Sequence, residues 1–349
     1  MARPYPANIL PLALSQGDPA GIGPELTLKA WLKTHENPDM PPFFVVANPE
    51  QLAATARDLG LNVPVKIVLD ADAAMVFRHA LPVFALNHSV FGKSGFPDVR
   101  DAAGTIASIE TCVQLIRAGK ASAVVTNPIA KELFYRAHFR YPGHTEFLEE
   151  LAERHFGVSA RAVMLIWSPK FSVVPATVHI PLARVPSMLT RALLVETGLV
   201  VAHDLTSRFG IRKPRLAFTS LNPHAGEGGA MGREEIDVIA PALADLTAAG
   251  VAVSGPYPAD SLFRPSARKT YDAAIAMYHD QALIPVKTVA FDTAVNVTLG
   301  LPLIRTSPDH GTAFDIAGKG IANPTSLIAA LQLAGKLARR SGSGQTRRH

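Results

Sequence analysis

Residues 8–33, NILPLALSQGDPAGIGPELTLKAWLK, show the pattern from which the fold class can be predicted. An apolar, strand-like run at 8–15 leads into a glycine-rich turn, and a helical run at 24–33 follows with proline at its first position. The same order of strand and helix recurs at 43–59 and at 123–137. Because strands that alternate with helices build mostly parallel sheets, the sequence predicts an α/β architecture.

Strands and helices continue to alternate through the rest of the chain. Further strand-like runs lie at 163–167, 172–178, 215–220 and 273–277, with helical runs at 145–155 and 233–248, and short strand-like runs continue to residue 303. No internal repeat or long low-complexity linker interrupts them. The last residues, 339–349, are rich in Gly, Ser and Arg, and we expect a disordered basic tail there.

The composition is that of a soluble globular protein with a substantial core. Of the 349 residues, 48% are hydrophobic and 18% are charged, which suits two domains or one large one. The longest apolar runs are too short to cross a bilayer, and the first residues lack the pattern of a signal peptide, so we expect a cytoplasmic protein without a membrane partner. With Cys112 as the single cysteine, neither an internal disulfide nor a cysteine-rich zinc site can form.

The positive charge does not by itself indicate nucleic acid. The formal net charge is +5, but four of the arginines that contribute to it lie in the tail after residue 338. No motif that combines basic and aromatic residues appears elsewhere in the sequence. The sequence also has no P-loop, no G-x-S-x-G elbow and no H-E-x-x-H motif, so kinases, serine hydrolases and zincins lose support. The glycine-rich turn at 17–25 departs from the G-x-G-x-x-G spacing and is only weak support for a dinucleotide.

Three histidines each follow an apolar, strand-like run: His179, His224 and His279. In open α/β sheets ligands collect beyond the carboxyl ends of the strands, so three imidazoles converging there would suit zinc, cobalt or a similar divalent ion. Ordinary hydrogen-bonded histidines are the alternative, because the spacing is too long for a zinc motif. Asp260 and Asp280 are candidate carboxylates beside such a site, or else a loop cap and a surface charge.

Two further regions have the residue types that bind anions. His144 and Thr145 open a helical run, where free backbone N–H groups favour a phosphate, although simple capping explains Thr145 equally well. Lys287, Asn296 and Arg305 are spaced nine residues apart. Arg305 suits a bidentate clamp on phosphate or carboxylate, and Lys287 suits an anion contact or an acid/base, whereas isolated basic residues are more often solvated.

Seven blocks, in order along residues 17–318, together resemble the 4-hydroxythreonine-4-phosphate dehydrogenase family. They are GDPAGIGPE, NPIAKE, GHTEFL, SLNPHAGEGG, GPYPAD, MYHDQAL and VNVTLGLPLIRTSPDHGTAFDIAG. The resemblance covers nearly the whole chain and is highly specific to the family. It is less specific to one substrate, because close relatives act on phosphorylated sugar acids or on dihydrodiols.

The resemblance implies two α/β/α domains of the isocitrate/isopropylmalate dehydrogenase type, with the active site in the interdomain cleft. The first domain is expected at 1–127 plus 286–338, and the second, with the metal ligands and dimer contacts, at 128–285. A homodimer is implied whose sites are completed across the subunit interface.

The resemblance also implies roles for individual residues. It makes His179, His224 and His279 the ligands of a divalent metal: zinc, cobalt or magnesium. It makes a second group of residues contacts of a small phosphorylated hydroxy amino acid: His144, Thr145, Lys287, Asn296 and Arg305. Lys287 is also our candidate for proton transfer. We count Asp260 as the second catalytic candidate.

A second resemblance concerns the cofactor. Residues 310–320 look like the adenosine-binding loop of isocitrate and isopropylmalate dehydrogenases, which implies cofactor contacts from His310, Gly311, Thr312, Ala313 and Asp315. An acidic side chain at 315 would accept from the ribose hydroxyls and repel a 2′-phosphate, so NAD is expected, with NADP as the alternative. Two features depart from that group: a phenylalanine at 314 replaces its usual proline, and the metal ligands are histidines instead of aspartates.

The implied reaction is NAD-dependent oxidation of 4-phosphooxy-L-threonine at C3 to 2-amino-3-oxo-4-(phosphooxy)butanoate. Loss of its carboxylate gives 3-amino-2-oxopropyl phosphate, an intermediate of pyridoxine 5′-phosphate (vitamin B6) biosynthesis. Three alternatives stay open. One is a related dehydrogenase of threonate or erythronate 4-phosphate or of a dihydrodiol, another is a metal-dependent phosphohydrolase, and the last is a non-catalytic binding protein.

Overall fold

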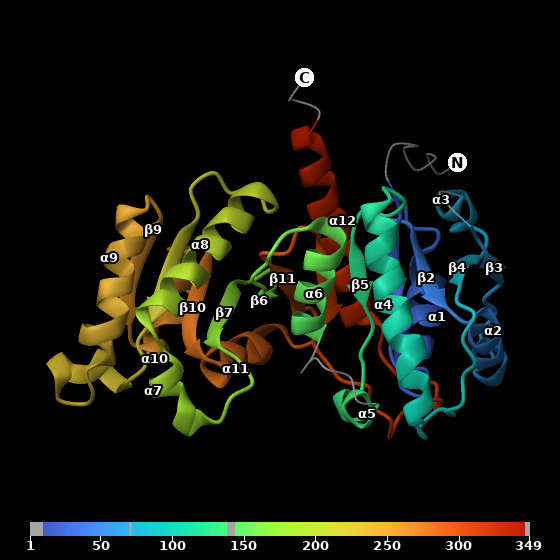
Figure 1. Ribbon diagram of the computed structural model, residues 1–349, viewed down its shortest axis with the longest axis horizontal. Coiled ribbons are helices and arrows are strands. Elements are labelled where there is room, and N and C mark those ends of the chain that lie inside the picture. Colours follow the sequence, from blue (N-terminus) through green and yellow to red (C-terminus); the bar gives the residue numbers. More distant parts are fainter. Residues whose placement is uncertain (1–9, 70–71, 138–143, 346–349) are drawn as a thin grey trace. The chain divides into compact units, whose positions relative to one another are not determined.

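The computed structural model describes residues 10–69, 72–137 and 144–345, and Figure 1 shows the path of the chain. The chain divides into two compact units. Unit 1 combines the described residues up to Ala162 with those from Leu301 onward, and unit 2 runs from Val163 to Gly300. Each unit has its own helices and its own run of paired strands.

The boundaries between the units differ from the expected ones, which ended the first domain at 127 and resumed it at 286. Residues 144–156 form α6 (His144–Phe156), which packs on α4 (Ala102–Arg117) and therefore belongs to unit 1. Strand β11 (Val295–Leu299) pairs with β6 (Val163–Trp167) and therefore belongs to unit 2. Pairing and packing of distant segments set both boundaries, and neither is visible in local sequence spacing.

Six parallel strands form the sheet of unit 1, in the order β3-β4-β2-β1-β5-β12. Their bounds are β1 (Leu12–Ser15), β2 (Phe43–Ala47), β3 (Val65–Ile67), β4 (Leu81–Ala85), β5 (Val124–Thr126) and β12 (Arg305–Pro308). Most of their residues are buried, as expected for a parallel sheet covered by helices on both faces.

The helices of unit 1 cover both faces of its sheet (Figure 1). Besides α4 and α6 they are α1 (Gly23–Thr34), α2 (Pro49–Asp58), α3 (Ala73–Val76), η1 (Val99–Asp101), α5 (Lys131–Arg136) and α12 (Thr325–Gln345). One core cluster joins Ala13, Phe44 and Val124 of the strands to residues of α4 and α6. Alternate strand residues turn to the opposite face, where α1 and α12 contact each other.

Helix α12 corrects the expectation of a disordered tail from residue 339, because it continues to Gln345. The side chains of Arg339 and Ser341 bond to carbonyls four residues earlier in the helix. The glycines of the tail weaken a helix by only about 1 kcal/mol each, which an already formed helix tolerates. Residues 346–349 lie outside the described part of the chain.

Unit 2 holds six strands in the order β11-β6-β7-β10-β8-β9. The strands not yet introduced are β7 (Ser172–Thr177), β8 (Arg215–Thr219), β9 (Ala252–Tyr257) and β10 (Ala273–Tyr278). Strand β6 is antiparallel to both neighbours, whereas β7, β10, β8 and β9 run parallel to one another. The carboxyl ends of these four strands therefore lie at one edge of the sheet.

The helices of unit 2 pack on this sheet. They are η2 (Leu182–Arg184), α7 (Val185–Met188), α8 (Arg191–Ser207), η3 (Pro223–Gly229), η4 (Glu235–Ile239), α9 (Ala240–Ala248), α10 (Ala259–Leu262), η5 (Ala267–Lys269) and α11 (His279–Ala290). A core cluster joins strand residues such as Ile166 and Val173 to Ala282, Leu283 and Val286 of α11. Among the described residues no single helix could cross a membrane. One bent pair, 182–188 with 191–207, passes on length and composition, its parts meeting at 90°.

Candidate active site

Two of the three predicted metal histidines lie together in unit 2. His179 follows β7 and His279 follows β10, and these neighbouring parallel strands align Thr177 with Tyr278. The two imidazole rings are 5.6 Å apart between centroids. At that separation one nitrogen of each ring can reach a common ion with bonds of about 2.1 Å. The other end of the His279 ring is fixed, because Nδ1 lies 2.7 Å from Oδ1 of Asp280.

The third histidine, His224, occupies a left-handed turn after β8. Residues 224–228 all have positive φ, between 44° and 77°, and the non-glycines among them are His224, Ala225 and Glu227. Left-handed backbone costs about 1–2 kcal/mol for each such residue, so other contacts must hold the turn. Oε1 of Glu235 holds the segment that leads into the turn by accepting from the backbone N–H of Leu221 and of Asn222, at 2.9 and 2.8 Å.

The turn exposes His224 and pairs it with an acid. The His224 side chain is 69% exposed, and its Nδ1 lies 3.3 Å from Oε2 of Glu227. Among the described residues, no three or more His, Cys, Asp or Glu side chains are grouped to hold a metal ion. One chain therefore brings two of the predicted ligands together and does not group the third with them. Asp260 is the second residue of α10, which follows β9, and it is exposed at the same edge of the sheet.

Lys287 and Asn296 lie toward the opposite end of the unit 2 sheet. Asn296 is paired with Ile166, and Ile166 is paired with Val173 near the start of β7. That level is four residues, about 13 Å, from the end of β7 that leads to His179. Lys287 lies eight residues along α11 from its first residue, or about 12 Å. The structure therefore separates these two side chains from the paired histidines of the same chain.

In unit 1, Arg305 is a buried cation at the start of β12. Its guanidinium Nη2 and Nε donate to Oγ1 of Thr126 at 2.6 and 3.2 Å. Burial lowers the pKa of Arg305 to about 10, so it is charged near neutral pH. His144 and Thr145 are the first two residues of α6, and the preceding residues 138–143 lie outside the described part of the chain.

The predicted cofactor loop follows β12 in unit 1. Asp315 is exposed, and it makes no hydrogen bond or ion pair to any residue that the structure describes. Ala313 adopts a φ of 43°, an uncommon conformation for a residue with a side chain. Nδ1 of His310 lies 3.1 Å from the carbonyl of Gly311. The loop thus presents a carboxylate that can accept hydrogen bonds from a ligand.

The glycine-rich turn, weak in the sequence, proves to contact this loop directly. The backbone N–H of Ile22 donates to the carbonyl of Thr312 at 2.9 Å. A side chain at Gly21 would meet Thr312 at 3.0 Å, and one at Gly17, whose φ is 73°, would collide with Asn127 at 2.7 Å. These glycines therefore permit close packing of backbone, which sequence spacing alone did not reveal.

Asp18 in the same turn is a buried carboxylic acid. Its side chain accepts a hydrogen bond from the N–H of Ala20 at 2.9 Å. Burial raises the pKa of Asp18 to about 6, the charge of Asp101 adds to the rise, and the Ala20 bond opposes it. Asp18 thus changes its charge within the physiological range.

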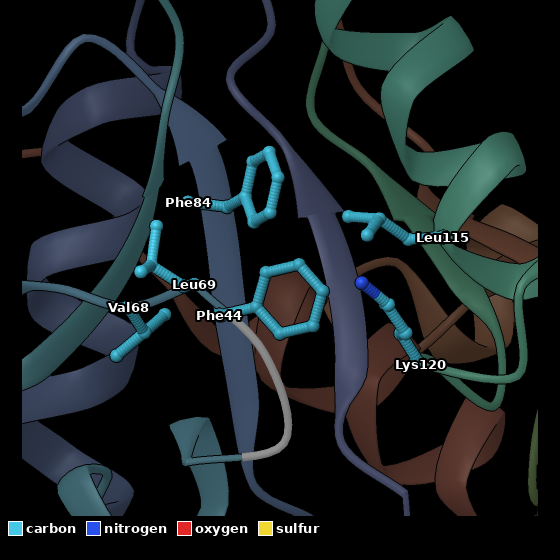
Figure 2. Close-up of a pocket in the computed structure, with 6 residues that line it drawn as sticks. All are labelled: Phe44, Val68, Leu69, Phe84, Leu115 and Lys120. Atoms are coloured by element: carbon cyan, nitrogen blue, oxygen red, sulfur yellow. The ribbon is translucent and has the colours of Figure 1, made fainter.

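Figure 2 shows a mainly apolar pocket in unit 1, and none of the predicted site residues lines it. Its lining is Phe44, Val68, Leu69, Phe84, Leu115 and Lys120. The space in it is about 10 Å³, which is barely enough for one water molecule. A substrate or cofactor cannot occupy so small a space, and the exposed Leu69 places the pocket at the surface of the unit.

Comparison with known proteins identifies relatives over most of the chain. Residues 39–334 match the model of the family described as pyridoxal phosphate biosynthetic protein PdxA. The chain is 55% identical over 338 residues to the 4-hydroxythreonine-4-phosphate dehydrogenase of Methylorubrum populi, which covers 96% of this chain and 97% of the relative.

Solved structures show the same relationship. The crystal structure of 4-hydroxythreonine-4-phosphate dehydrogenase from Klebsiella pneumoniae superposes with a TM-score of 0.82 at 34% identity, covering 94% of this chain and 99% of that one. A terephthalate 1,2-cis-dihydrodiol dehydrogenase from Burkholderia xenovorans is more distant, with a TM-score of 0.62 and 26% identity over 94% of this chain and 98% of that one. The expected α/β fold of the dehydrogenase type is confirmed.

Proposed function

The chain belongs to the PdxA family of pyridoxal phosphate biosynthetic proteins, and from that premise we propose that it oxidises 4-phosphooxy-L-threonine at C3 with NAD. The product, 2-amino-3-oxo-4-(phosphooxy)butanoate, then loses its carboxylate as CO₂ to give 3-amino-2-oxopropyl phosphate. At the coarser level the chain is an oxidoreductase. The main support for this substrate is the 55% identity, over nearly all of both chains, to a relative named 4-hydroxythreonine-4-phosphate dehydrogenase.

A dihydrodiol is the weaker candidate substrate, because the solved dehydrogenase of that kind shares only 26% of its residues with this chain. A phosphorylated sugar acid differs from the proposed substrate by a hydroxyl in place of the amine. Both alternatives would use the same oxidation of a secondary alcohol, so only turnover with each substrate separates them.

The residues at the strand ends of unit 2 support a divalent metal. His179 and His279 are imidazoles at a separation that suits a shared zinc or cobalt ion, and Asp280 orients the second ring as a carboxylate behind a metal ligand does. Magnesium fits this nitrogen donor set less well. Such an ion makes a neighbouring alcohol more acidic. We assign His224 as the third ligand.

The protein's own groups would bind and deprotonate the substrate. We assign Arg305 to the phosphate, because a buried guanidinium holds a planar array of donors and keeps its charge. Asn296, His144 and Thr145 are proposed as further contacts. Lys287 takes the C3 hydroxyl proton in this scheme, with Asp260 as a second candidate acid/base.

The loop after β12 supports NAD as the hydride acceptor. Asp315 is exposed and can accept from the two ribose hydroxyls of NAD, whereas a 2′-phosphate would meet its negative charge. NADP is therefore expected to bind more weakly. Gly311 has open space where a side chain would lie, which leaves room for close approach of the nucleotide.

We further propose that two copies of the chain complete each site. One chain leaves His224 apart from the other two histidines and separates them from Lys287 and Asn296. A large apolar side chain is exposed within seven residues after each histidine: Leu182 at 68%, Met231 at 47% and Ile284 at 63%. Apolar side chains exposed around polar site residues are typical of surfaces that a second copy covers.

The test follows nicotinamide reduction with 4-phosphooxy-L-threonine, using NAD and NADP separately. It is run before chelation, after chelation, and after return of zinc, cobalt or magnesium. We expect reduction of NAD that chelation abolishes and metal restores, and slower turnover of threonate 4-phosphate and of a cis-dihydrodiol. Faster turnover of either alternative would reassign the substrate, and release of free phosphate without reduction would identify a phosphohydrolase.

A further inference from the structure

Helix α1 and the cofactor loop are joined by contacts that the reaction itself does not require. We infer that Glu25 and Lys29 of α1 are positioning residues for NAD, because they fix the far end of the loop that follows His310 and so set the affinity for the dinucleotide. This inference rests on the proposed function, which assigns NAD to that loop.

Lys29 makes three short contacts at the end of the loop. Its Nζ donates to the carbonyls of Gly320 and Ala322 at 2.7 and 3.0 Å, and to Oε1 of Glu25 at 2.7 Å. An ammonium group has three N–H donors, so the three acceptors can use all of them. Lys29 therefore ties two backbone positions of the loop, almost 300 residues away in sequence, to the first helix.

Glu25 completes this contact from inside the protein. Its side chain is 2% exposed, and Oε1 also accepts from the backbone N–H of Ala322 at 2.9 Å. An exposed pair four residues apart on a helix contributes little to stability, but a carboxylate as buried as this one needs a cation and a donor to offset its lost hydration. The pair is thus part of the loop's attachment.

The other end of the loop, at Thr312, is held by the residue that precedes α1. The N–H of Ile22, the residue before α1, donates to the carbonyl of Thr312. The helix is itself anchored, because Nε1 of Trp31 donates to the carbonyl of Phe77 at 2.7 Å. A rigid element therefore fixes both ends of the segment 312–322. Between them lies Ala313, whose positive φ persists only where its surroundings determine it.

A loop that is fixed before binding loses less conformational entropy when the nucleotide binds. Removing the Lys29 contacts should therefore weaken NAD binding and leave binding of the phosphorylated amino acid unchanged. Lys33 provides the matched control. It lies one turn further along α1, is exposed, and makes no hydrogen bond or ion pair to the described residues.

The experiment titrates NAD into the full-length, metal-loaded protein by calorimetry. For Lys29→Met we expect the Kd for NAD to rise about tenfold, as for loss of one charge-assisted hydrogen bond, with kcat at saturating NAD and the substrate KM nearly unchanged. Hydrogen exchange in 312–322 should become faster. Lys33→Met should match the wild type, and Lys29→Arg should recover most of the affinity. The double variant Glu25→Gln with Lys29→Met leaves no unpaired buried charge. It replaces Lys29→Met in the NAD titration if that single variant does not fold.

Two results distinguish failure of the positioning role from failure of the proposed function. If the wild type binds NAD and reduces it, but folded Lys29→Met or the double variant binds NAD equally well, the positioning role is wrong and the proposed function stands. If the unaltered protein neither binds nor reduces NAD, the proposed function is wrong and the inference falls with it. A lower melting temperature with unchanged NAD affinity would show a structural role only.

Discussion

Among single residues, His279 is the one on which the proposed metal site depends most directly. It faces His179 and is oriented by Asp280, so its removal leaves only one imidazole of this pair. We expect His279→Ala to lose its bound zinc or cobalt and at least about 100-fold in kcat/KM, more than loss of an outer-shell partner costs. Metal content by mass spectrometry and the rate of NAD reduction measure the two effects.

His203 provides the control for that substitution. It lies on α8 with 76% of its side chain exposed, away from the carboxyl ends of the strands. His203→Ala should keep both the metal and the rate. If His279→Ala retained its metal and its activity, the assignment of the strand-end histidines would be wrong.

Asp18 should make stability depend on pH. Burial raises its folded pKa from 3.8 to about 6, so the folded protein binds this proton more tightly than the unfolded chain does. Stability is therefore lost as pH rises from about 4 to about 6, by at most about 3 kcal/mol. Asp18→Asn, which stays neutral, should be more stable than the wild type at pH 7.5 and equal to it near pH 4.

Urea unfolding at pH 4, 5.5 and 7.5 measures the Asp18 effect. Asp58→Asn, on the exposed end of α2, is the control and should follow the wild type at each pH. A constant difference between Asp18→Asn and the wild type across this range would mean that Asp18 does not titrate as its burial implies.

At the scale of elements, the left-handed turn of η3 decides where His224 is presented. Gly226 and Gly228 both have positive φ, but a Cβ at Gly226 would lie 2.6 Å from Oε2 of Glu235, whereas one at Gly228 meets nothing within 4 Å. Alanine at either position strains the backbone by about 1 kcal/mol. Only Gly226→Ala should also push Glu235 away from the turn.

We therefore expect Gly226→Ala to lower the free energy of unfolding by about 3 kcal/mol and Gly228→Ala by about 1 kcal/mol. Gly226→Ala should also reduce metal content, because His224 would move. Urea midpoints and metal analysis on the same samples test both effects. Equal losses for the two variants would show that the contact with Glu235 does not hold the turn.

The elements also show which features local sequence can predict. Strands β7 and β10 were expected from their apolar runs, and the convergence of His179 with His279 followed, because parallel strands end at one edge. The position of His224 could not be predicted in this way. Its turn places three non-glycine residues at positive φ, against their local preference, and contacts with Glu235 at a distance in sequence maintain it.

For the whole molecule, the alternation of strands and helices was enough to predict the α/β class. It did not predict where the chain divides into its two units. The start of unit 2 and its end depend on pairing between β6 and β11, which are far apart in sequence. The attachment of α1 to Ala322 is similarly invisible, because nothing in the spacing of Glu25 and Lys29 indicates a partner 297 residues from Glu25.

The proposed completion of each site by two copies makes the last prediction. Within one chain the paired histidines lie at one end of the unit 2 sheet and Lys287 toward the other. If a site takes the paired His179 and His279 from one copy and Lys287 from the second, His279→Ala and Lys287→Met are each inactive alone. In a mixed dimer, however, one site receives both intact groups. After unfolding and refolding an equal mixture, half of the dimers are mixed, so about a quarter of the wild-type activity should return.

The controls for this mixture are each variant refolded alone and the wild type refolded in parallel. Size-exclusion chromatography with light scattering checks that dimers form, since monomers that are fully active would already contradict the proposal. Activity that stays at the level of the separate variants, although mixed dimers are present, would mean that the histidines and Lys287 of a site belong to one chain. Recovery near a quarter requires that they come from different chains, because no dimer in the mixture has both groups intact in the same copy.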